Sequence, residues 1–219
     1  ADSGWQTIAT IQYLANAPED FVPYLRHHFE IAQGGDGAPI VATGIRIKVS
    51  DGMIAIDELE IYPTGEEREP GDPNVKPTKE EATMAIEPES GFEILWDGNE
   101  GDFYDEAALA EAPENAALES KGATVFGSSE LDLGVHYIRN INDGLYGNGN
   151  SWIPKFTVPA DDAPFVGISF GGLIPVRSIA WGRDNGNNTD DCCGGQLRDR
   201  AIDVYQIDYT TIEDPSSDT

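Results

Sequence analysis

The sequence contains very little cysteine. Two of its 219 residues are cysteines, and they are neighbours, Cys192 and Cys193. Two adjacent cysteines cannot supply the disulfide framework of a small secreted domain, and their spacing does not fit a zinc site. Three interpretations stay open for this pair: a strained vicinal disulfide, two reduced thiols, or a bond to another chain.

Positive charge is also scarce. The chain has 13 Lys and Arg against 40 Asp and Glu, which gives a formal net charge of -27. Such a surface repels nucleic-acid phosphates and anionic lipids, so we expect neither as a partner. The same surface favours divalent cations, or it is a solvated acidic coat that keeps the protein soluble in salty water.

Long apolar runs and familiar catalytic motifs are missing too. No segment reaches the roughly 18–20 consecutive apolar residues that span a bilayer, so we expect no membrane insertion. The three histidines are scattered, and no Gly-x-Ser-x-Gly, His-Glu-x-x-His or Gly-x-Gly-x-x-Gly motif occurs. We therefore predict a protein that is not an enzyme. Residues 1–4 are typical of the start of a chain after secretory cleavage, which favours an extracellular or cell-surface location.

What the sequence does contain is a set of short segments in which apolar and polar residues alternate. Alternation with period two is typical of strands that bury one face. Gly, Pro and Asn clusters separate the segments, which favours antiparallel pairing over βαβ units. The predicted fold is an all-β, antiparallel β-sandwich of the jelly-roll type. The predicted strands are 5–13, 44–49, 54–62, 165–170, 178–181 and 201–210.

Three other segments differ from this pattern. Residues 18–28 begin with a proline and are predicted to form a short helical turn. Residues 63–81 are rich in Pro, Glu, Lys and Gly, which predicts an exposed linker. Residues 92–105 hold aromatic side chains among acids, and they fit either an ordered flap or an extra hairpin.

The stretch 140–152 is the most specific in the chain. Its Asn-Asp-Gly and Gly-Asn-Gly-Asn steps exclude regular structure and predict a tight loop. Such a loop turns backbone carbonyls toward one point and adds the side-chain oxygens of Asn142, Asp143, Asn148 and Asn150. Oxygen-rich sites of irregular geometry suit Ca²⁺. Composition alone leaves a calcium loop and an ordinary Asn/Gly turn equally open.

The run Asn-Asp-Gly-Leu-Tyr-Gly-Asn at 142–148, followed by Ser-Trp-Ile at 151–153, resembles the calcium loop of discoidin domains. These galactose-binding-like β-sandwiches include the C-terminal domains of coagulation factors and many sugar-binding modules of secreted bacterial proteins. Further similarity lies in Trp-Gly-Arg-Asp at 181–184, Asp-Arg at 199–200 and Tyr-Gln-Ile-Asp-Tyr at 205–209. The resemblance covers about residues 115–212.

The first third of the chain resembles the same family, but out of order. Residues 5–11, 43–49 and 56–62 look like strands that close the usual discoidin sequence. The chain therefore resembles a circularly permuted discoidin domain. We divide it into residues 1–62 (the usual C-terminal half), 63–114 (a linker and insertion) and 115–219 (the usual N-terminal half). The two halves can close within one chain or complement neighbouring molecules head to tail.

The resemblance also implies functional residues. It implies that Asp143 and Glu58 supply side-chain ligands to Ca²⁺. The further candidate ligands are backbone oxygens near Asn140, Leu145 and Asn148 and the side chain of Asn150. Contacts to a sugar, as in carbohydrate-binding relatives, would come from Arg183, Trp96, Tyr104 and Tyr146.

Two functions follow from these observations. The first is a structural subunit of a surface fibre or extracellular array, which assembles with copies of itself through complementation between chains. The permuted order and the acidic segment 63–114 favour it. The alternative is a calcium-stabilised carbohydrate-binding module of a secreted protein.

Overall fold

The computed structural model describes residues 4–15, 24–35, 37–50, 54–64, 82–96, 114–131, 134–145, 151–155, 163–184 and 204–217. Within these ranges the chain forms strands joined by turns and three short 3₁₀ helices, η1 (Glu119–Lys121), η2 (Ile138–Asn142) and η4 (Pro215–Ser217). None of the helices in the described part is long and apolar enough to cross a membrane.

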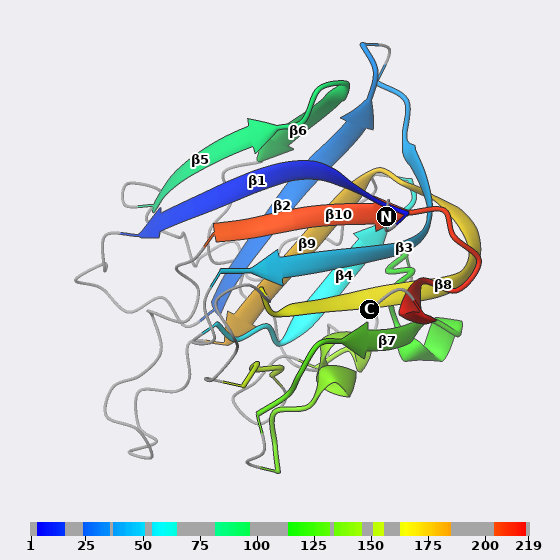
Figure 1. Cartoon of the computed structure of the whole chain (residues 1–219). Helices are drawn as coiled ribbons and strands as arrows, with labels where there is room; N and C mark the ends of the chain where they lie inside the picture. The colour runs from blue at the N-terminus through cyan, green and yellow to red at the C-terminus, as the bar shows by residue number, and fades with distance from the viewer. Residues whose placement is uncertain are drawn as a thin grey trace.

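The strands form two antiparallel sheets that pack face to face, which confirms the predicted all-β sandwich. In Figure 1 the six-stranded sheet crosses in front of the steeper strands of the four-stranded sheet. The larger sheet runs in the order β5 (Ala82–Pro88), β1 (Trp5–Ala15), β10 (Val204–Thr210), β3 (Ile40–Val49), β8 (Phe165–Val176), β7 (Thr124–Gly127). The smaller runs β4 (Glu58–Tyr62), β9 (Ser178–Asp184), β2 (Tyr24–Gln33), β6 (Phe92–Trp96).

The core lies between the sheets and is built by period-two alternation. Ile45 and Ile47 of β3 point inward and are fully buried, as is Ile207 of β10. Aromatic rings join the two layers: Trp181 of β9 lies 5.3 Å from Tyr205 of β10, measured between ring centroids. Full burial of one such aliphatic side chain contributes about 1.5–3 kcal/mol, so the alternation seen in the sequence accounts for much of the stability.

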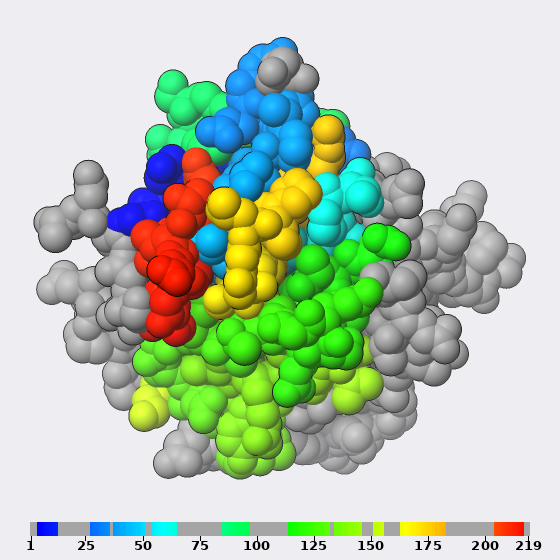
Figure 2. Space-filling view, turned by 90° about the vertical axis from the view of Figure 1, so that its right-hand side faces the viewer, coloured from blue at the N-terminus to red at the C-terminus, as the bar shows by residue number. Residues whose placement is uncertain are grey.

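Strands from the two ends of the chain alternate within both sheets. In the larger sheet β10 lies between β1 and β3, and in the smaller sheet β9 lies between β4 and β2. Figure 2 shows the same mixing on one face, where the C-terminal residues in red lie beside the N-terminal residues in blue. The segments 1–62 and 115–219 therefore pair with each other within this one chain.

Two segments differ from their sequence-based expectation. The predicted helical turn at 18–28 is wrong over residues 24–28, because these belong to β2, whose inward side chains Phe29 and Ile31 are buried. The segment 63–114 holds β5 and β6, which join through residues 89–91 and extend one sheet each. Of residues 92–105, predicted to be an ordered flap or an extra hairpin, the described Phe92–Trp96 form a strand that pairs with β2 and not with β5, so it is not one arm of a β-hairpin. Residues 97–105 lie outside the described residues.

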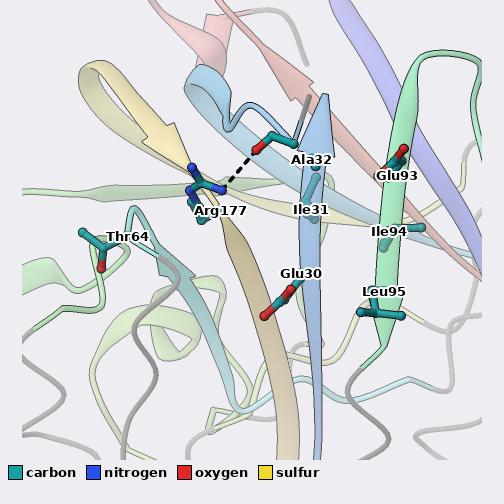
Figure 3. Close-up of a pocket in the computed structure, with 9 residues that line it drawn as sticks. Glu30, Ile31, Ala32, Thr64, Glu93, Ile94, Leu95 and Arg177 are labelled. Atoms are coloured by element: carbon teal, nitrogen blue, oxygen red, sulfur yellow. Dashed lines mark hydrogen bonds between the residues drawn. The ribbon is translucent and has the colours of Figure 1, made fainter. Parts of the chain in front are cut away.

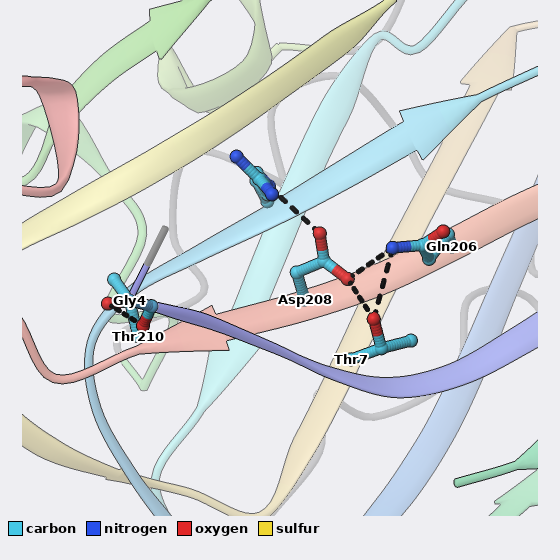
Figure 4. Close-up of polar contacts among 6 residues, drawn as sticks. Gly4, Thr7, Gln206, Asp208 and Thr210 are labelled. Carbon is cyan, nitrogen blue, oxygen red and sulfur yellow. Dashed lines mark hydrogen bonds and ion pairs between the residues drawn. The ribbon is translucent and has the colours of Figure 1, made fainter. Parts of the chain in front are cut away.

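A charged cluster lies on the outer face of the six-stranded sheet, where Arg46, Asp208 and Thr7 come from adjacent strands (Figure 4). The Nε of Arg46 lies 2.9 Å from Oδ2 of Asp208, and both side chains are buried. Thr7 Oγ1 and Gln206 Nε2 donate to the other carboxylate oxygen at 2.9 and 2.7 Å. The guanidinium lies over the Trp5 ring, 4.2 Å from its centroid. This network ties β1, β10 and β3 together.

Candidate functional site

The candidate site lies where the start of β4 meets the loop after η2. Leu59 and Ile61 of β4 point into the core, so Glu58 and Glu60 point to the opposite face of the sheet. Both acids are nevertheless 1% exposed. Backbone at the end of η2 contacts Glu58, because Gly144 donates its N–H to Oε2 at 3.1 Å.

The loop itself is held by side-chain amides. Asn140 donates from Nδ2 to the carbonyls of Val135 at 2.9 Å and Ser151 at 3.1 Å. Asn142 donates to the carbonyls of Ala117 at 3.0 Å and Ala123 at 3.4 Å. These bonds use the amide nitrogens as donors, so the loop geometry is fixed by residues that lie outside the acidic cluster.

A second connection joins the loop to the segment before β4. Ile56 and Trp152 form an antiparallel bridge, with N–H to carbonyl distances of 3.0 and 2.6 Å in the two directions. The Trp152 ring is fully buried and donates from Nε1 to the carbonyl of Ser129 at 2.8 Å. Glu58 is thus placed against the loop by backbone pairing two residues earlier in the chain.

Glu58 lies in an environment that disfavours its charge. Burial raises the pKa of Glu58 well above its usual range, and repulsion from Glu60, Asp143 and Asp57 adds to the shift. The N–H of Gly144 acts in the opposite direction. The second oxygen, Oε1, is buried and has no hydrogen-bond partner among the described residues. An orphaned carboxylate oxygen of this kind costs free energy unless a proton or a cation meets it.

Asp143 faces the same cluster from the loop. Its side chain keeps contact with solvent, but partial burial of the carboxyl raises the pKa of Asp143 to about 6. The N–H of Leu145, which donates to Oδ1 at 2.9 Å, and the charge of Arg139 lower the pKa, whereas Glu119 raises it. Two carboxyl groups with raised pKa values therefore lie at the joint between β4 and the loop, and the charge of Asp143 contributes to the raised pKa of Glu58.

The chemistry of this joint fits a hard cation with oxygen ligands. In the described part of the chain no three His, Cys, Asp or Glu side chains group to hold a metal ion. A cation here would be held by the carboxylates of Glu58 and Asp143 together with loop carbonyls, which is a donor set that Ca²⁺ accepts. Such an ion would explain why Oε1 of Glu58 is buried without a hydrogen-bond partner among the described residues.

The structure brings together some of the predicted ligands. Glu58 and Asp143 interact, and Asn140 and Leu145 belong to the same loop, whereas Asn148 and Asn150 lie outside the described residues. Asp57 and Glu60 are cluster members that the sequence reasoning missed. Their signal was three acids among the inward-facing Ile56, Leu59 and Ile61.

The predicted sugar-contact residues are not brought together in the described part. Trp96 lies on β6, at the opposite edge of the four-stranded sheet from β4. Arg183 lies on β9, where its backbone pairs with Leu25. Tyr104 and Tyr146, like Cys192 and Cys193, lie outside the described residues. The sugar site and the state of the cysteines stay predictions.

Comparison of the chain with protein-family models, curated proteins and solved structures gives no significant match in any of the three.

Proposed function

We propose that the protein is a non-catalytic, calcium-stabilised β-sandwich that serves as a structural subunit outside the cell. The observation that carries the proposal is the buried carboxyl of Glu58, which accepts a hydrogen bond from Gly144 next to Asp143 and leaves its other oxygen without a hydrogen bond among the described residues. The resemblance of residues 142–153 to the calcium loop of discoidin domains also supports Ca²⁺ as the bound ion.

The energetics favour a cation at this joint. Removal of a carboxylate from water costs several kcal/mol unless a partner of opposite charge compensates it. Gly144 supplies one N–H to Glu58, while three acids repel it. Ca²⁺ would replace the lost hydration with direct carboxylate bonds and would turn the mutual repulsion into shared ligation.

The burial of the acids supports a structural role over a catalytic one. Glu58 and Glu60 are each 1% exposed, so a substrate cannot approach them in this conformation. The ion would join β4, from the first third of the chain, to the loop near Asp143. A weak calcium site suits the calcium-rich extracellular space, where modules of this kind bind with dissociation constants of about 10⁻⁴–10⁻³ M.

Self-assembly belongs to this proposal because the two halves can also pair between molecules. Exchange of the segment 1–62 with a neighbour would preserve the pairings of β10 with β1 and β3. A head-to-tail exchange does not close and extends into a fibre. The calcium joint would then lie between two molecules.

Calcium titration of the whole chain tests the proposal. We expect isothermal titration calorimetry to show one site that disappears in Glu58→Gln and Asp143→Asn, whereas Glu87→Gln, an exposed acid on β5, keeps it. Light scattering with and without a chelator measures assembly. Calcium binding of equal strength in all three variants would contradict the assigned site, and a monomer at every calcium concentration would contradict self-assembly.

A further inference from the structure

The strand β6 ends the four-stranded sheet. Among the described strands it pairs with β2 alone, with Ile31 opposite Ile94 and Glu30 opposite Leu95. Edge strands carry backbone groups that can pair with another chain. Pairing at β6 depends on which of its backbone N–H and C=O groups point to the open side and on the side chains around them.

The hydrogen bonds of β2 determine which backbone groups of β6 point to its open side. Ile31 donates its N–H to the carbonyl of Arg177 at 2.7 Å, on the side away from β6. Opposite residues in an antiparallel ladder alternate between pairs that exchange hydrogen bonds and pairs that do not. Ile31 and Ile94 therefore form a pair that exchanges no hydrogen bonds. The N–H and C=O of Ile94 consequently point to the open edge. The same alternation turns the backbone groups of Trp96 outward.

Within the described residues, this edge carries few of the features that usually block pairing, apart from its short length of five residues and its one acid, Glu93. The strand reads Phe-Glu-Ile-Leu-Trp, with no proline, no lysine and no register shift against β2. Its outward-facing Leu95 is 65% exposed, whereas Ile94 and Trp96 on the inward side are half-buried. An added strand would cover apolar surface on both faces.

The surroundings of the edge are acidic. A groove of about 710 Å³ runs over β2 beside β6, and Figure 3 shows Glu93 and Leu95 on one side and Arg177 on the other. Glu30 and Glu93 are exposed, and no described residue gives either carboxylate a hydrogen bond or an ion pair. Arg177 donates to the carbonyl of Gly37 at 3.1 Å. Among the described residues that line the groove, two carboxylates stand against the one guanidinium of Arg177, so the charge beside the edge is net negative.

We propose that the open edge of β6 binds an extended basic segment of a partner protein by strand addition. The partner strand pairs with the backbone of Ile94 and Trp96. Its apolar side chains continue the inward face, and its Lys or Arg side chains lie over Leu95 and reach Glu93 and Glu30. A second copy of this chain fits this edge poorly, because the added strand must supply Lys or Arg side chains and the chain has 13 of these against 40 Asp and Glu. This binding mode is independent of the calcium site.

The test uses the whole chain with calcium and synthetic peptides of about eight residues, the length of an ordinary strand. The probe alternates Lys and Val, and its two controls alternate Glu and Val or replace Val by Pro. We expect fluorescence anisotropy to show binding of the Lys/Val peptide alone. Hydrogen exchange should slow at the amides of Ile94 and Trp96.

Two pairs of substitutions separate the contribution of backbone pairing to peptide binding from the contribution of charge. Ile94→Pro removes an N–H that points outward, while Ile94→Ala loses the same side chain and keeps that N–H, so we expect the Pro variant to bind about tenfold more weakly than the Ala variant. Glu93→Lys should weaken binding by a similar factor, with Glu87→Lys on β5 as the matched charge control. If Ile94→Pro fails to fold, the comparison of Glu93→Lys with Glu87→Lys and the hydrogen-exchange data still test the proposal.

Several results would overturn the proposal. These are absence of Lys/Val binding, equal binding of the Glu/Val peptide, equal weakening by Ile94→Pro and Ile94→Ala, or slowed exchange at a strand other than β6.

Discussion

Two clusters of buried charge lie on the outer faces of opposite sheets, and they are completed differently. On the six-stranded sheet, Asp208 meets the guanidinium of Arg46 at 2.9 Å and accepts further hydrogen bonds on its other oxygen. On the four-stranded sheet, Glu58 meets other acids and one backbone N–H. The first cluster contains its own cation, whereas no described basic side chain forms a salt bridge with Glu58.

The two clusters should therefore differ in how their contribution to stability responds to ions and to substitution. The Arg46 cluster is satisfied by the chain alone, so it should be indifferent to ions in solution and sensitive to loss of either partner. The Glu58 cluster is incomplete within the described residues, so its contribution to stability should depend on calcium and on pH. Substitutions in each cluster, compared with and without calcium, test that contrast.

Loss of Arg46 should have the largest effect. Arg46→Ala leaves the buried carboxylate of Asp208 without its cation, and we expect the free energy of unfolding to fall by about 3–5 kcal/mol in urea denaturation. The size should be the same with calcium and with a chelator. Lys48→Ala, on the same face of β3, is the control and should change stability by less than about 0.5 kcal/mol. A calcium-dependent loss in Arg46→Ala would contradict the contrast.

Glu58→Gln should change sign with calcium. At about one hundred times the dissociation constant, bound calcium stabilises the unsubstituted protein by about 2.7 kcal/mol, and the variant lacks this contribution, so in calcium it should be the less stable of the two. In a chelator the variant should instead be more stable than the unsubstituted protein, because Gln replaces a carboxyl group that must either bury its charge among acids or take up a proton on folding. Thermal unfolding in the two buffers measures both signs. A loss of equal size in both would mean that Glu58 acts by packing alone.

Without calcium, the acidic cluster should make stability fall as pH rises. Folding raises the pKa of Asp143 from 3.8 to about 6 and raises that of Glu58. The folded state therefore holds protons that the unfolded state has released, and stability decreases from about pH 4 upward. Across the same range calcium should bind more tightly, because its ligands must be deprotonated. Urea midpoints in chelator between pH 4 and 7 test this, and a flat profile would contradict it.

Thr7→Val should have the smallest effect. It removes the hydrogen bond of 2.9 Å to Asp208 and the one of 3.1 Å that Thr7 Oγ1 accepts from Gln206, while Gln206 keeps its bond to Asp208 at 2.7 Å. We expect a loss of about 1 kcal/mol, independent of calcium. Thr10→Val on the same strand, whose side chain takes no part in this network, serves as the comparison.

Six of the strands could be predicted because their alternation of apolar and polar residues has a period of two. The other four, β2, β5, β6 and β7, could not be predicted in this way. A proline and a histidine pair precede the apolar residues of β2, β5 and β6 belong to a Pro- and Glu-rich segment, and β7 has only four residues. Local pattern records which face a residue prefers, but not which strand will cover it.

The meeting of Glu58 with Asp143 was anticipated by the family resemblance, not by spacing. Arg46 and Asp208 are 162 residues apart, and their pairing depends on the register of β10 against β3, which neither segment encodes by itself. The burial of Glu60 likewise required knowledge of the loop that covers β4. Such features arise from tertiary structure and lie beyond a local reading.

The place of β10 between β1 and β3 also has a consequence during synthesis on the ribosome. Strands β1 and β3 leave the ribosome long before β10, and Thr7 must wait for Asp208, 201 residues later. Until then the two early strands flank a gap one strand wide, with apolar faces open to other nascent chains. Pairing over such sequence separation is slow. Passage through the cell should therefore depend on chaperones that shield this gap until the last strand arrives.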